Sequence, residues 1–270
     1  MSQTSLSPTG VERVPFRSGE LVVYRLGEGE PVVYLHGMLG NPGIHPFLEE
    51  LAASRSVVAP CLPGFTGSSP DFDLCDLYDW VFALSELVDT LELAGLPLVA
   101  SSVSAMLALE LEAIRPGAFA AMALVAPLGL WDETEPVRDL FGERASQQPA
   151  RLLVDPSKAS RLFEDDPKAS YEEAVRLGAE RYHSRRAAAQ LFWPFPEFGL
   201  ARRIHRVVCP VGLVWGEDDW VAPVSYTERF ASLLPRHVGT ITVPGAGHAA
   251  EWDQPERVCR AALELLSRGA

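Results

Sequence analysis

Short hydrophobic runs of strand length recur along the chain and alternate with segments of helical spacing. Residues 11–16 and 21–26 flank a turn at Ser18-Gly19 and predict an edge hairpin. Three more strand-length runs follow, each close to a segment of helical period: VVYLHG at 32, SVVAPCLPG at 56 and PLVAS at 97. Their continuous Val and Leu content is typical of parallel strands covered by helices on both faces. The pattern therefore predicts an α/β fold with a mostly parallel sheet.

The same alternation continues beyond these runs. Helical spacing over 103–114 predicts a helix directly after the strand at 97. AAMALVAP at 120 then predicts another buried strand. Apolar runs begin again at 207 and 238, and each is followed by a stretch of helical spacing.

Residues 128–200 interrupt the strand pattern. Charged residues increase there, strand-length runs disappear, and an aromatic and proline cluster occupies 192–198. We therefore predict one α/β domain formed by residues 1–127 and 201–270, with 128–200 as a helical cap. A cap inserted between strand ends is expected to lie over the carboxyl edge of the sheet, where such sheets bind ligands.

Composition narrows the class of protein. The chain has 270 residues, and its 47% hydrophobic and 22% charged residues are ordinary for a globular domain. A net charge of -13 argues against nucleic acid as a partner, because phosphate binding needs clustered Lys and Arg. We expect a small-molecule substrate as the partner, and a homo-oligomer stays open.

Cysteine spacing and the apolar segments exclude further classes. The four cysteines are far apart and form no C-x-x-C pair, so they predict neither a zinc site nor a redox motif: Cys61, Cys75, Cys209 and Cys259. Residues 1–10 lack a basic start followed by an apolar run, which indicates a cytoplasmic protein. The longest apolar stretch, 118–131, is too short to cross a bilayer, so no membrane association is expected.

A candidate nucleophile lies in LVASSVSAM, where a strand turns abruptly into a helix. Ser102 occupies the apex, and Ala100 and Ser104 are small enough to avoid collision across the turn. The usual form of this turn has glycine at both places, so a serine-rich helix cap is the rival interpretation. The N–H of Val103 would face the position of a developing oxyanion.

HGMLG at 36–40 is a candidate oxyanion loop. Its glycines let the backbone approach a ligand closely, and Met38 would supply a second N–H to the oxyanion. His36 precedes this loop, where it either braces the loop or lines the substrate pocket.

Two later loops carry a candidate acid and a candidate base. WGEDDWVAP ends a strand with Asp218 and Asp219, and the spacing from Gly216 favours Asp219 as the carboxylate that orients a histidine. His248 follows a Gly-Ala-Gly loop after the last strand, which favours it as the general base.

Taken in order, these motifs resemble the α/β-hydrolase superfamily over almost the whole chain. They read HG-x-x-G, LPGF-x-G-S, small-x-Ser-x-small, G-x-x-D-x-x-x-P and G-x-GH. The order Ser, Asp, His also matches that family. The resemblance implies an eight-stranded, mostly parallel sheet with helices on both faces and a helical lid. Dehalogenases and epoxide hydrolases of this superfamily have Asp at the elbow, so Ser102 disfavours both activities.

The function expected from these residues is that of a serine hydrolase. Ser102, His248 and Asp219 would cleave a small or medium carboxylic ester or lactone through an acyl-enzyme, with neither a metal nor an organic cofactor. Family members that cleave carbon–carbon bonds in ring-fission diketones use the same three residues, so this activity and thioester hydrolysis stay open. A non-catalytic ligand-binding homologue is a further alternative.

Aromatic residues near strand ends and in the cap suggest an apolar substrate pocket. Trp131, Trp193 and Trp220 are the candidate pocket residues, together with His36. Packing of the cap against the sheet is the alternative role for such side chains.

Overall fold

An eight-stranded sheet forms the centre of the computed structural model, which describes residues 10–163, 169–193 and 197–269. Its strands are β1 (Gly10–Phe16), β2 (Gly19–Leu26), β3 (Pro31–Leu35), β4 (Ser56–Pro60), β5 (Leu96–Ser101), β6 (Phe119–Val125), β7 (Val211–Gly216) and β8 (His237–Val243). They lie in the order β1-β2-β4-β3-β5-β6-β7-β8. β2 pairs antiparallel with β1 and β4, and the other pairs are parallel. The mostly parallel α/β sheet is thus confirmed.

The N-terminal hairpin turns one residue earlier than the sequence predicts. Arg17 and Ser18 form the turn, and Gly19 is already the first residue of β2. Arg17 has φ +51°, a left-handed conformation that costs a non-glycine residue about 1–2 kcal/mol. Its guanidinium donates to Asp71 at 2.6 Å and to Glu86 at 2.8 Å, which holds the turn against the rest of the domain.

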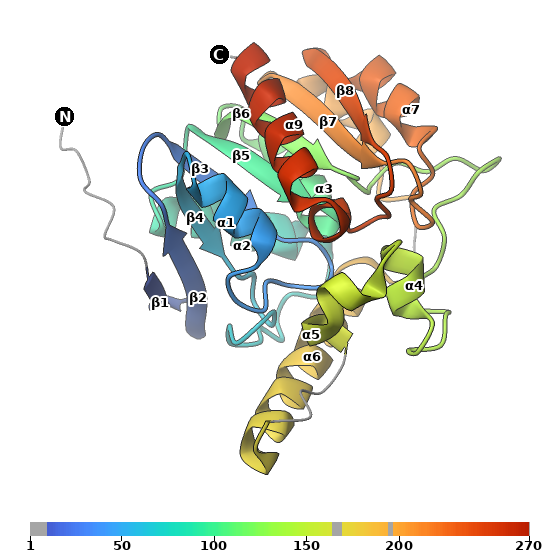
Figure 1. The fold of residues 1–270 in the computed structure, drawn as a ribbon. Coiled ribbons are helices and arrows are strands. Elements are labelled where there is room, and N and C mark those ends of the chain that lie inside the picture. The colour runs from blue at the N-terminus through green and yellow to red at the C-terminus, as the bar shows by residue number, and fades with distance from the viewer. Residues whose placement is uncertain (1–9, 164–168, 194–196, 270) are drawn as a thin grey trace.

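Helices cover both faces of the sheet (Figure 1). The helices of the α/β core are α1 (Pro46–Ala52), α2 (Leu77–Thr90), α3 (Ser102–Ile114), α7 (Tyr226–Leu233), α8 (Ala250–Asp253) and α9 (Pro255–Arg268). α1 and α9 pack together on one face, and α2 and α3 pack together on the other. Each face has its own cluster of buried hydrophobic side chains. This two-layer burial explains why the strands carry unbroken apolar runs.

The helix α3 is buried along nearly its whole length, although it contains two glutamates. Glu110 is fully buried and accepts two hydrogen bonds from the guanidinium of Arg203, at 2.6 and 2.7 Å. Glu112 accepts the backbone N–H groups of Gly117 and Phe119 at 2.8 and 3.2 Å. Because both carboxylates have partners, the helix that begins at Ser102 can lie inside the domain.

A helical insertion separates β6 from β7, which confirms the predicted cap. It contains α4 (Gln148–Leu152), η1 (Pro156–Ala159), α5 (Ser160–Phe163) and α6 (Tyr171–Phe192), followed by η2 (Leu200–Arg202) and η3 (Ile204–Arg206). In Figure 1 these cap helices lie together at one end of the sheet, and α6 extends away from the core. The domain boundaries at 127/128 and 200/201 stay a prediction. Part of the aromatic cluster, 194–196, lies outside the described residues.

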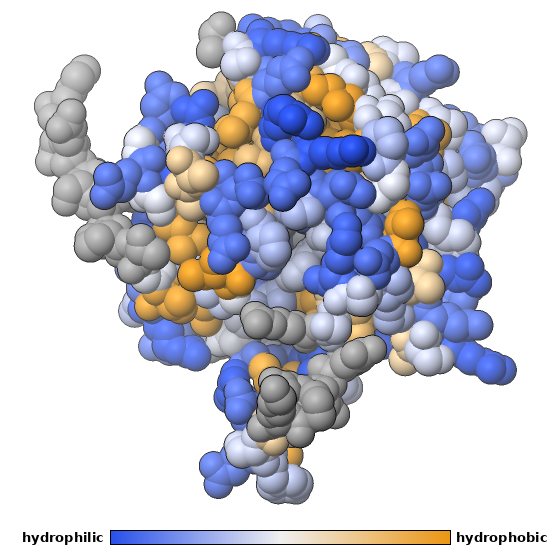
Figure 2. All heavy atoms as spheres, in the orientation of Figure 1, coloured by the Kyte–Doolittle hydropathy of each residue, from blue (hydrophilic) through white to orange (hydrophobic). Residues whose placement is uncertain are grey.

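Hydrophilic residues cover much of the molecular face that includes α1 and α9, with smaller hydrophobic areas between them (Figure 2). α9 follows the expected amphipathic pattern, because its buried residues recur at helical spacing. Within the described part of the chain, no helix combines the length and the apolar character needed to cross a membrane.

The ion pair between Glu110 and Arg203 gives a test of the packing. Replacing Arg203 with Ala would leave the Glu110 carboxylate buried without its charged partner, so we expect the free energy of unfolding to fall by about 3 kcal/mol. Urea denaturation followed by circular dichroism measures the change. Arg202→Ala is the matched control, because Arg202 is largely exposed and its pair with Glu197 spans 3.5 Å. Equal losses in the two variants would contradict the assigned role of the buried pair.

Candidate active site

Ser102 lies at the tip of a sharp turn between β5 and α3. It has φ +52°, a conformation that is strained for a residue with a side chain and costs of order 1–3 kcal/mol. This backbone geometry presents the hydroxyl at the carboxyl edge of the sheet. Strain of this kind is typical of a nucleophile elbow, and it agrees with the turn predicted from the sequence.

The residues on either side of Ser102 fit the turn without the usual glycines. Ala100 is fully buried in β5. Ser104 is also fully buried, and its hydroxyl donates to the backbone carbonyl of His36. The hydroxyl of Ser104 therefore ties the first turn of α3 to the loop that follows β3. Gly37 of that loop approaches the elbow so closely that a Cβ there would lie 3.3 Å from the Cβ of Ser102.

The side chains of Ser102, His248 and Asp219 form one hydrogen-bonded line. Ser102 Oγ lies 2.7 Å from His248 Nε2, and His248 Nδ1 lies 2.8 Å from Asp219 Oδ2. A carboxylate only accepts, so Nδ1 carries the proton and Nε2 is left to accept from the serine hydroxyl. All three residues are buried, with exposed fractions of 2%, 1% and 7% for the serine, histidine and aspartate. The arrangement can move a proton from an alcohol to an imidazole.

The carboxylate of Asp219 is held by the loop that carries it. Its Oδ1 accepts the backbone N–H groups of Val221 and Ala222 at 2.8 and 2.9 Å, which leaves Oδ2 directed at His248. The neighbouring Asp218 is exposed. The fold therefore brings to the histidine the aspartate that the spacing from Gly216 predicts.

A glycine at the end of β7 allows the two loops to meet. A Cβ on Gly216 would lie 2.2 Å from the carbonyl oxygen of Gly247 and 2.4 Å from that of Ala246. No side chain fits there, because the obstacle is backbone on both sides. The loop that ends at His248 can therefore lie directly against the strand end that leads to Asp219.

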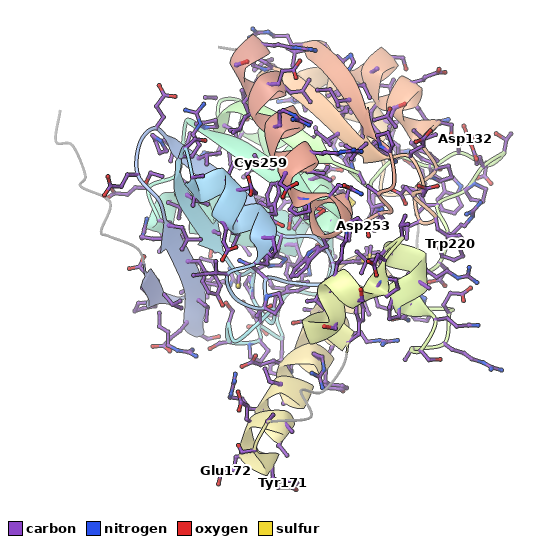
Figure 3. The ribbon with its side chains drawn as sticks, viewed as in Figure 1. Asp132, Tyr171, Glu172, Trp220, Asp253 and Cys259 are labelled. Carbon is purple, nitrogen blue, oxygen red and sulfur yellow. The ribbon has the colours of Figure 1, made fainter. Side chains whose placement is uncertain are left out.

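Asp253 is a positioning residue that the sequence analysis did not single out. It is 1% exposed, and its carboxylate accepts the N–H groups of Gly247 at 2.8 Å, Val154 at 2.9 Å and Asp155 at 3.0 Å. It thus joins the His248 loop to the cap near α4. Figure 3 labels Asp253 between the core and the cap helices. An acid placed two residues before Pro255, which opens α9, was the signal that could have indicated such a role.

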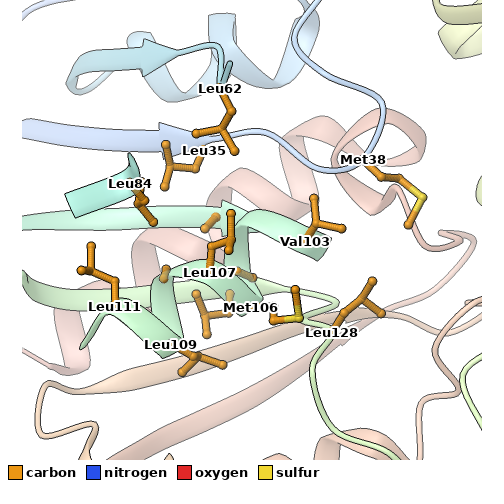
Figure 4. Close-up of a cluster of buried hydrophobic side chains, with 14 of the residues drawn as sticks. Leu35, Met38, Leu62, Leu84, Val103, Met106, Leu107, Leu109, Leu111 and Leu128 are labelled. Atoms are coloured by element: carbon orange, nitrogen blue, oxygen red, sulfur yellow. The ribbon is translucent and has the colours of Figure 1, made fainter. Parts of the chain in front are cut away.

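The predicted oxyanion donors lie on two elements that meet at the elbow. Val103 is the second residue of α3, and Met38 belongs to the loop after β3. Figure 4 shows both side chains within the buried hydrophobic cluster. Their backbone N–H groups therefore come from two segments that lie next to Ser102.

His36 lies behind this loop. Its Nδ1 contacts the carbonyl oxygen of Gly37 at 2.8 Å, and its Nε2 accepts the N–H of Leu62 at 3.0 Å. Burial lowers the pKa of His36 to about 4, so the ring is neutral at pH 7. Both nitrogens are used within the protein, which is the bracing arrangement anticipated as one of its two roles.

Two cavities adjoin the Ser102 region. A small one of about 10 Å³ is lined by Ser102 and His248, among others. A larger one of about 300 Å³ is lined mainly by apolar side chains of the cap and by polar residues of α6. The two share Met38, Leu39 and Leu152 in their walls, so the larger cavity lies next to the nucleophile.

The predicted tryptophans and His36 are absent from the described walls of both cavities. Trp131 is partly buried against the main core. Trp193 is 54% exposed and donates to Asp139 at 3.3 Å. Trp220 has the guanidiniums of Arg138 and Arg151 over its ring, at 5.3 and 4.7 Å from the ring centroid. Contact of these side chains with a substrate stays a prediction.

Within the described residues, no three His, Cys, Asp or Glu side chains are grouped as metal ligands would be. Every described cysteine is a free thiol. Burial raises the pKa values of Cys61, Cys209 and Cys259 above the ordinary range. These three thiols therefore have the character of core side chains.

Comparison with known proteins agrees with this geometry. Residues 32–261 match the sequence profile of the Alpha/beta hydrolase family. The chain is 26% identical over 251 residues to the dihydrolipoyllysine-residue acetyltransferase component of the acetoin cleaving system of Pseudomonas putida, covering 89% of this chain and 64% of that protein. It therefore spans less than two thirds of that relative's length.

Another curated relative and a solved structure are similar over most of their length. The (E)-2-((N-methylformamido)methylene)succinate hydrolase of Acinetobacter baylyi is 24% identical over 244 residues, covering 88% of this chain and 90% of that protein. The structure of a meta-cleavage product hydrolase from Pseudomonas fluorescens IP01 has a TM-score of 0.73 at 19% identity, covering 97% of this chain and 99% of that chain. This structural likeness shows a shared fold.

The role of Asp219 can be tested by the reactivity of Ser102. In Asp219→Asn the amide oxygen can still accept from Val221 and Ala222, but the amide N–H₂ group then faces His248 and favours the wrong tautomer. We expect the labelling of Ser102 by a fluorophosphonate to slow by on the order of 10³–10⁴-fold without unfolding. Rate constants from intact-protein mass spectrometry check this.

Asp218→Asn serves as the control, because it makes the same change on the exposed neighbour. It should label at close to the parental rate. If both variants labelled equally fast, Asp219 would not be the orienting acid.

Proposed function

The chain belongs to the alpha/beta hydrolase family, and we propose that it hydrolyses a small or medium carboxylic ester or lactone through an acyl-enzyme at Ser102. The observation that carries this proposal is the buried pair of hydrogen bonds that connects Ser102 Oγ through His248 to Asp219. A binding protein without catalysis would have no physical need for this arrangement.

Acylation begins with the histidine. His248 Nε2 takes the hydroxyl proton of Ser102 while Oγ attacks the substrate carbonyl carbon, and the carboxylate of Asp219 stabilises the imidazolium that forms. Collapse of the tetrahedral intermediate expels the alcohol, which receives the proton from His248. Ser102 is left acylated.

The backbone N–H groups of Met38 and Val103 hold the negative oxygen of the intermediate in this proposal. Two observations support them. The loop of Met38 lies against the elbow at Gly37, and Val103 lies in the first turn of α3, at the positive end of the helix dipole. Since both donors belong to the backbone, their placement survives side-chain substitutions that keep the turn.

The cavity beside Met38 supports a small or medium substrate. Its volume of about 300 Å³ is at the lower end of the range for ligand pockets, and its apolar walls include Leu140, Phe141 and Phe163 from the cap. Glu180 and Arg185 of α6 add charged groups to the lining. An acyl or alkoxy group with an apolar body and one polar end fits such a lining.

A hydrolase activity also agrees with the name of the Acinetobacter baylyi relative, which the chain matches over 90% of that protein's length. Carbon–carbon cleavage of diketones and thioester hydrolysis use the same nucleophile and base, so they are the alternative activities. Ester hydrolysis is preferred to carbon–carbon cleavage because it requires only acylation and deacylation, with no protonation of a carbon leaving group. Thioester hydrolysis uses the same two steps, so a comparison of substrates separates it from ester hydrolysis.

Removal of the nucleophile tests the mechanism. Ser102→Ala should lower kcat for p-nitrophenyl acetate by at least about 10⁴-fold while the circular dichroism spectrum is unchanged, because the acyl-enzyme can no longer form. Ser232→Ala replaces an exposed serine outside the site and should keep the parental rate. Parental turnover by Ser102→Ala would end the assignment.

A substrate panel tests the proposed bond type. The parent enzyme should have a higher kcat/KM for short and medium esters or lactones than for thioesters and ring-fission diketones of similar size. A clear preference for a thioester or a diketone would replace the ester proposal while leaving the nucleophile in place.

A further inference from the structure

Glu251 is a buried acid that the proposed mechanism does not use. It lies in α8, three residues after His248, with an exposed fraction of 2%. Within the described residues its Oε2 has no hydrogen-bond partner. An unpartnered carboxyl oxygen in the interior is costly, so the residue calls for a physical explanation.

The other buried acids of the described chain are all satisfied. Glu110 pairs with a guanidinium, Glu112 and Asp253 accept backbone N–H groups, and Asp219 binds both backbone and His248. Glu251 therefore differs from every other buried acid of the described chain in having a free acceptor. That acceptor is available to a group outside the protein.

Glu251 lines the small cavity together with Ser102 and His248. The volume of about 10 Å³ is close to the minimum that holds one water molecule. Such a water needs polar partners, and here the imidazole of His248, the hydroxyl of Ser102 and the carboxyl of Glu251 surround the space.

The groups around Glu251 come from several elements. The hydroxyls of Tyr34 in β3 and Ser101 in β5 hydrogen-bond to its carboxyl, while Oε2 is the oxygen left without a partner among the described residues, and His248 and Asp253 are the nearby titratable groups of the loop and of α8. Burial raises the pKa of the Glu251 carboxyl above its ordinary range, and the hydrogen bond from Ser101 counteracts part of this rise. A carboxyl has an oxygen that accepts from water in either protonation state.

We propose that the small cavity is the site of the water that hydrolyses the acyl-enzyme, and that Glu251 Oε2 positions this water. The inference rests on the acyl-enzyme of the proposed function. One water hydrogen is directed to His248 Nε2 and the other to Glu251 Oε2, which turns an oxygen lone pair toward the acyl carbon of Ser102.

Deacylation exchanges one bond at the acyl carbon for another. The water oxygen forms a bond to the acyl carbon while His248 Nε2 takes one proton from the water. The tetrahedral intermediate then breaks its bond to Ser102 Oγ, and His248 returns the proton to that oxygen. The product is the free carboxylic acid, and Glu251 is unchanged at the end.

The two half-reactions separate this role from a structural one. In Glu251→Met the water loses an acceptor, so deacylation should slow by about 10–100-fold while acylation stays within about threefold of the parent. Stopped-flow release of p-nitrophenol from p-nitrophenyl acetate measures acylation. Mass spectrometry of acetylated Ser102 measures deacylation, and the acetylated form should accumulate in the variant.

Two further variants serve as a conservative replacement and as a surface control. Glu251→Gln retains an oxygen that accepts from water and should recover most of the lost deacylation rate. Glu256→Met makes the same change on an exposed acid of α9 and should match the parent in both steps. A water-positioning role is overturned if Glu251→Met slows both steps equally, or slows neither.

Failure of this inference is distinguishable from failure of the proposed function. If the parent never forms acetylated Ser102, the acyl-enzyme itself is refuted, and with it the role of Glu251. If the parent is acetylated but the variant deacylates normally, only the role of Glu251 fails. Should Glu251→Met not fold, a crystal structure of the parent decides: a water bonded to Glu251 Oε2 and His248 Nε2 is expected, and its absence overturns the proposal.

Discussion

The hydrogen bond between Asp219 and His248 joins two loops that follow the neighbouring strands β7 and β8, and its geometry decides what Ser102 can do. The bond fixes the proton on Nδ1, so the other ring nitrogen faces the serine as an acceptor. It forms only because the loops approach within backbone contact, which the missing side chain of Gly216 permits. The alignment of the reactive groups therefore depends on close backbone packing at the end of β7.

The elbow shows how a turn can depart from the common pattern and keep its function. Glycine is usual two residues before and after the nucleophile because a Cβ tends to collide there. Ala100 is the smallest residue that still has a Cβ, and Ser104 uses its hydroxyl to bond the carbonyl of His36. The added hydrogen bond joins α3 to the loop that follows β3, close to the strained backbone of Ser102. The hydroxyl of Ser104, which a glycine would lack, thus stabilises the contact between α3 and the loop after β3.

The sheet, the cap and the three reactive residues could be predicted from the sequence because each depends on local signals. Apolar runs indicate strands, and glycine or acidic residues at strand ends indicate loops that meet at one edge of a parallel sheet. The lining of the substrate cavity depends instead on how the cap packs, which no local pattern encodes. Trp193 and Trp220 illustrate this limit, because one is mostly exposed and the other lies under two guanidiniums.

The two ends of the cap are bonded to different parts of the core: the end near α4 to the loop of His248, and α6 to other segments. Near α4, Leu152 accepts the N–H of Ala249 at 3.0 Å, and Asp253 binds two further N–H groups that follow α4, so this end cannot shift without moving the residues beside His248. α6 contacts the core through separate hydrogen bonds, such as that from the N–H of Thr66 to Ser184 Oγ at 3.0 Å. The larger cavity is lined both by Leu152 at the end of α4 and by residues of α6, so its wall includes a part bonded to the His248 loop and a part bonded to the core. One insertion therefore contributes both to the position of the His248 loop and to the lining of the larger cavity.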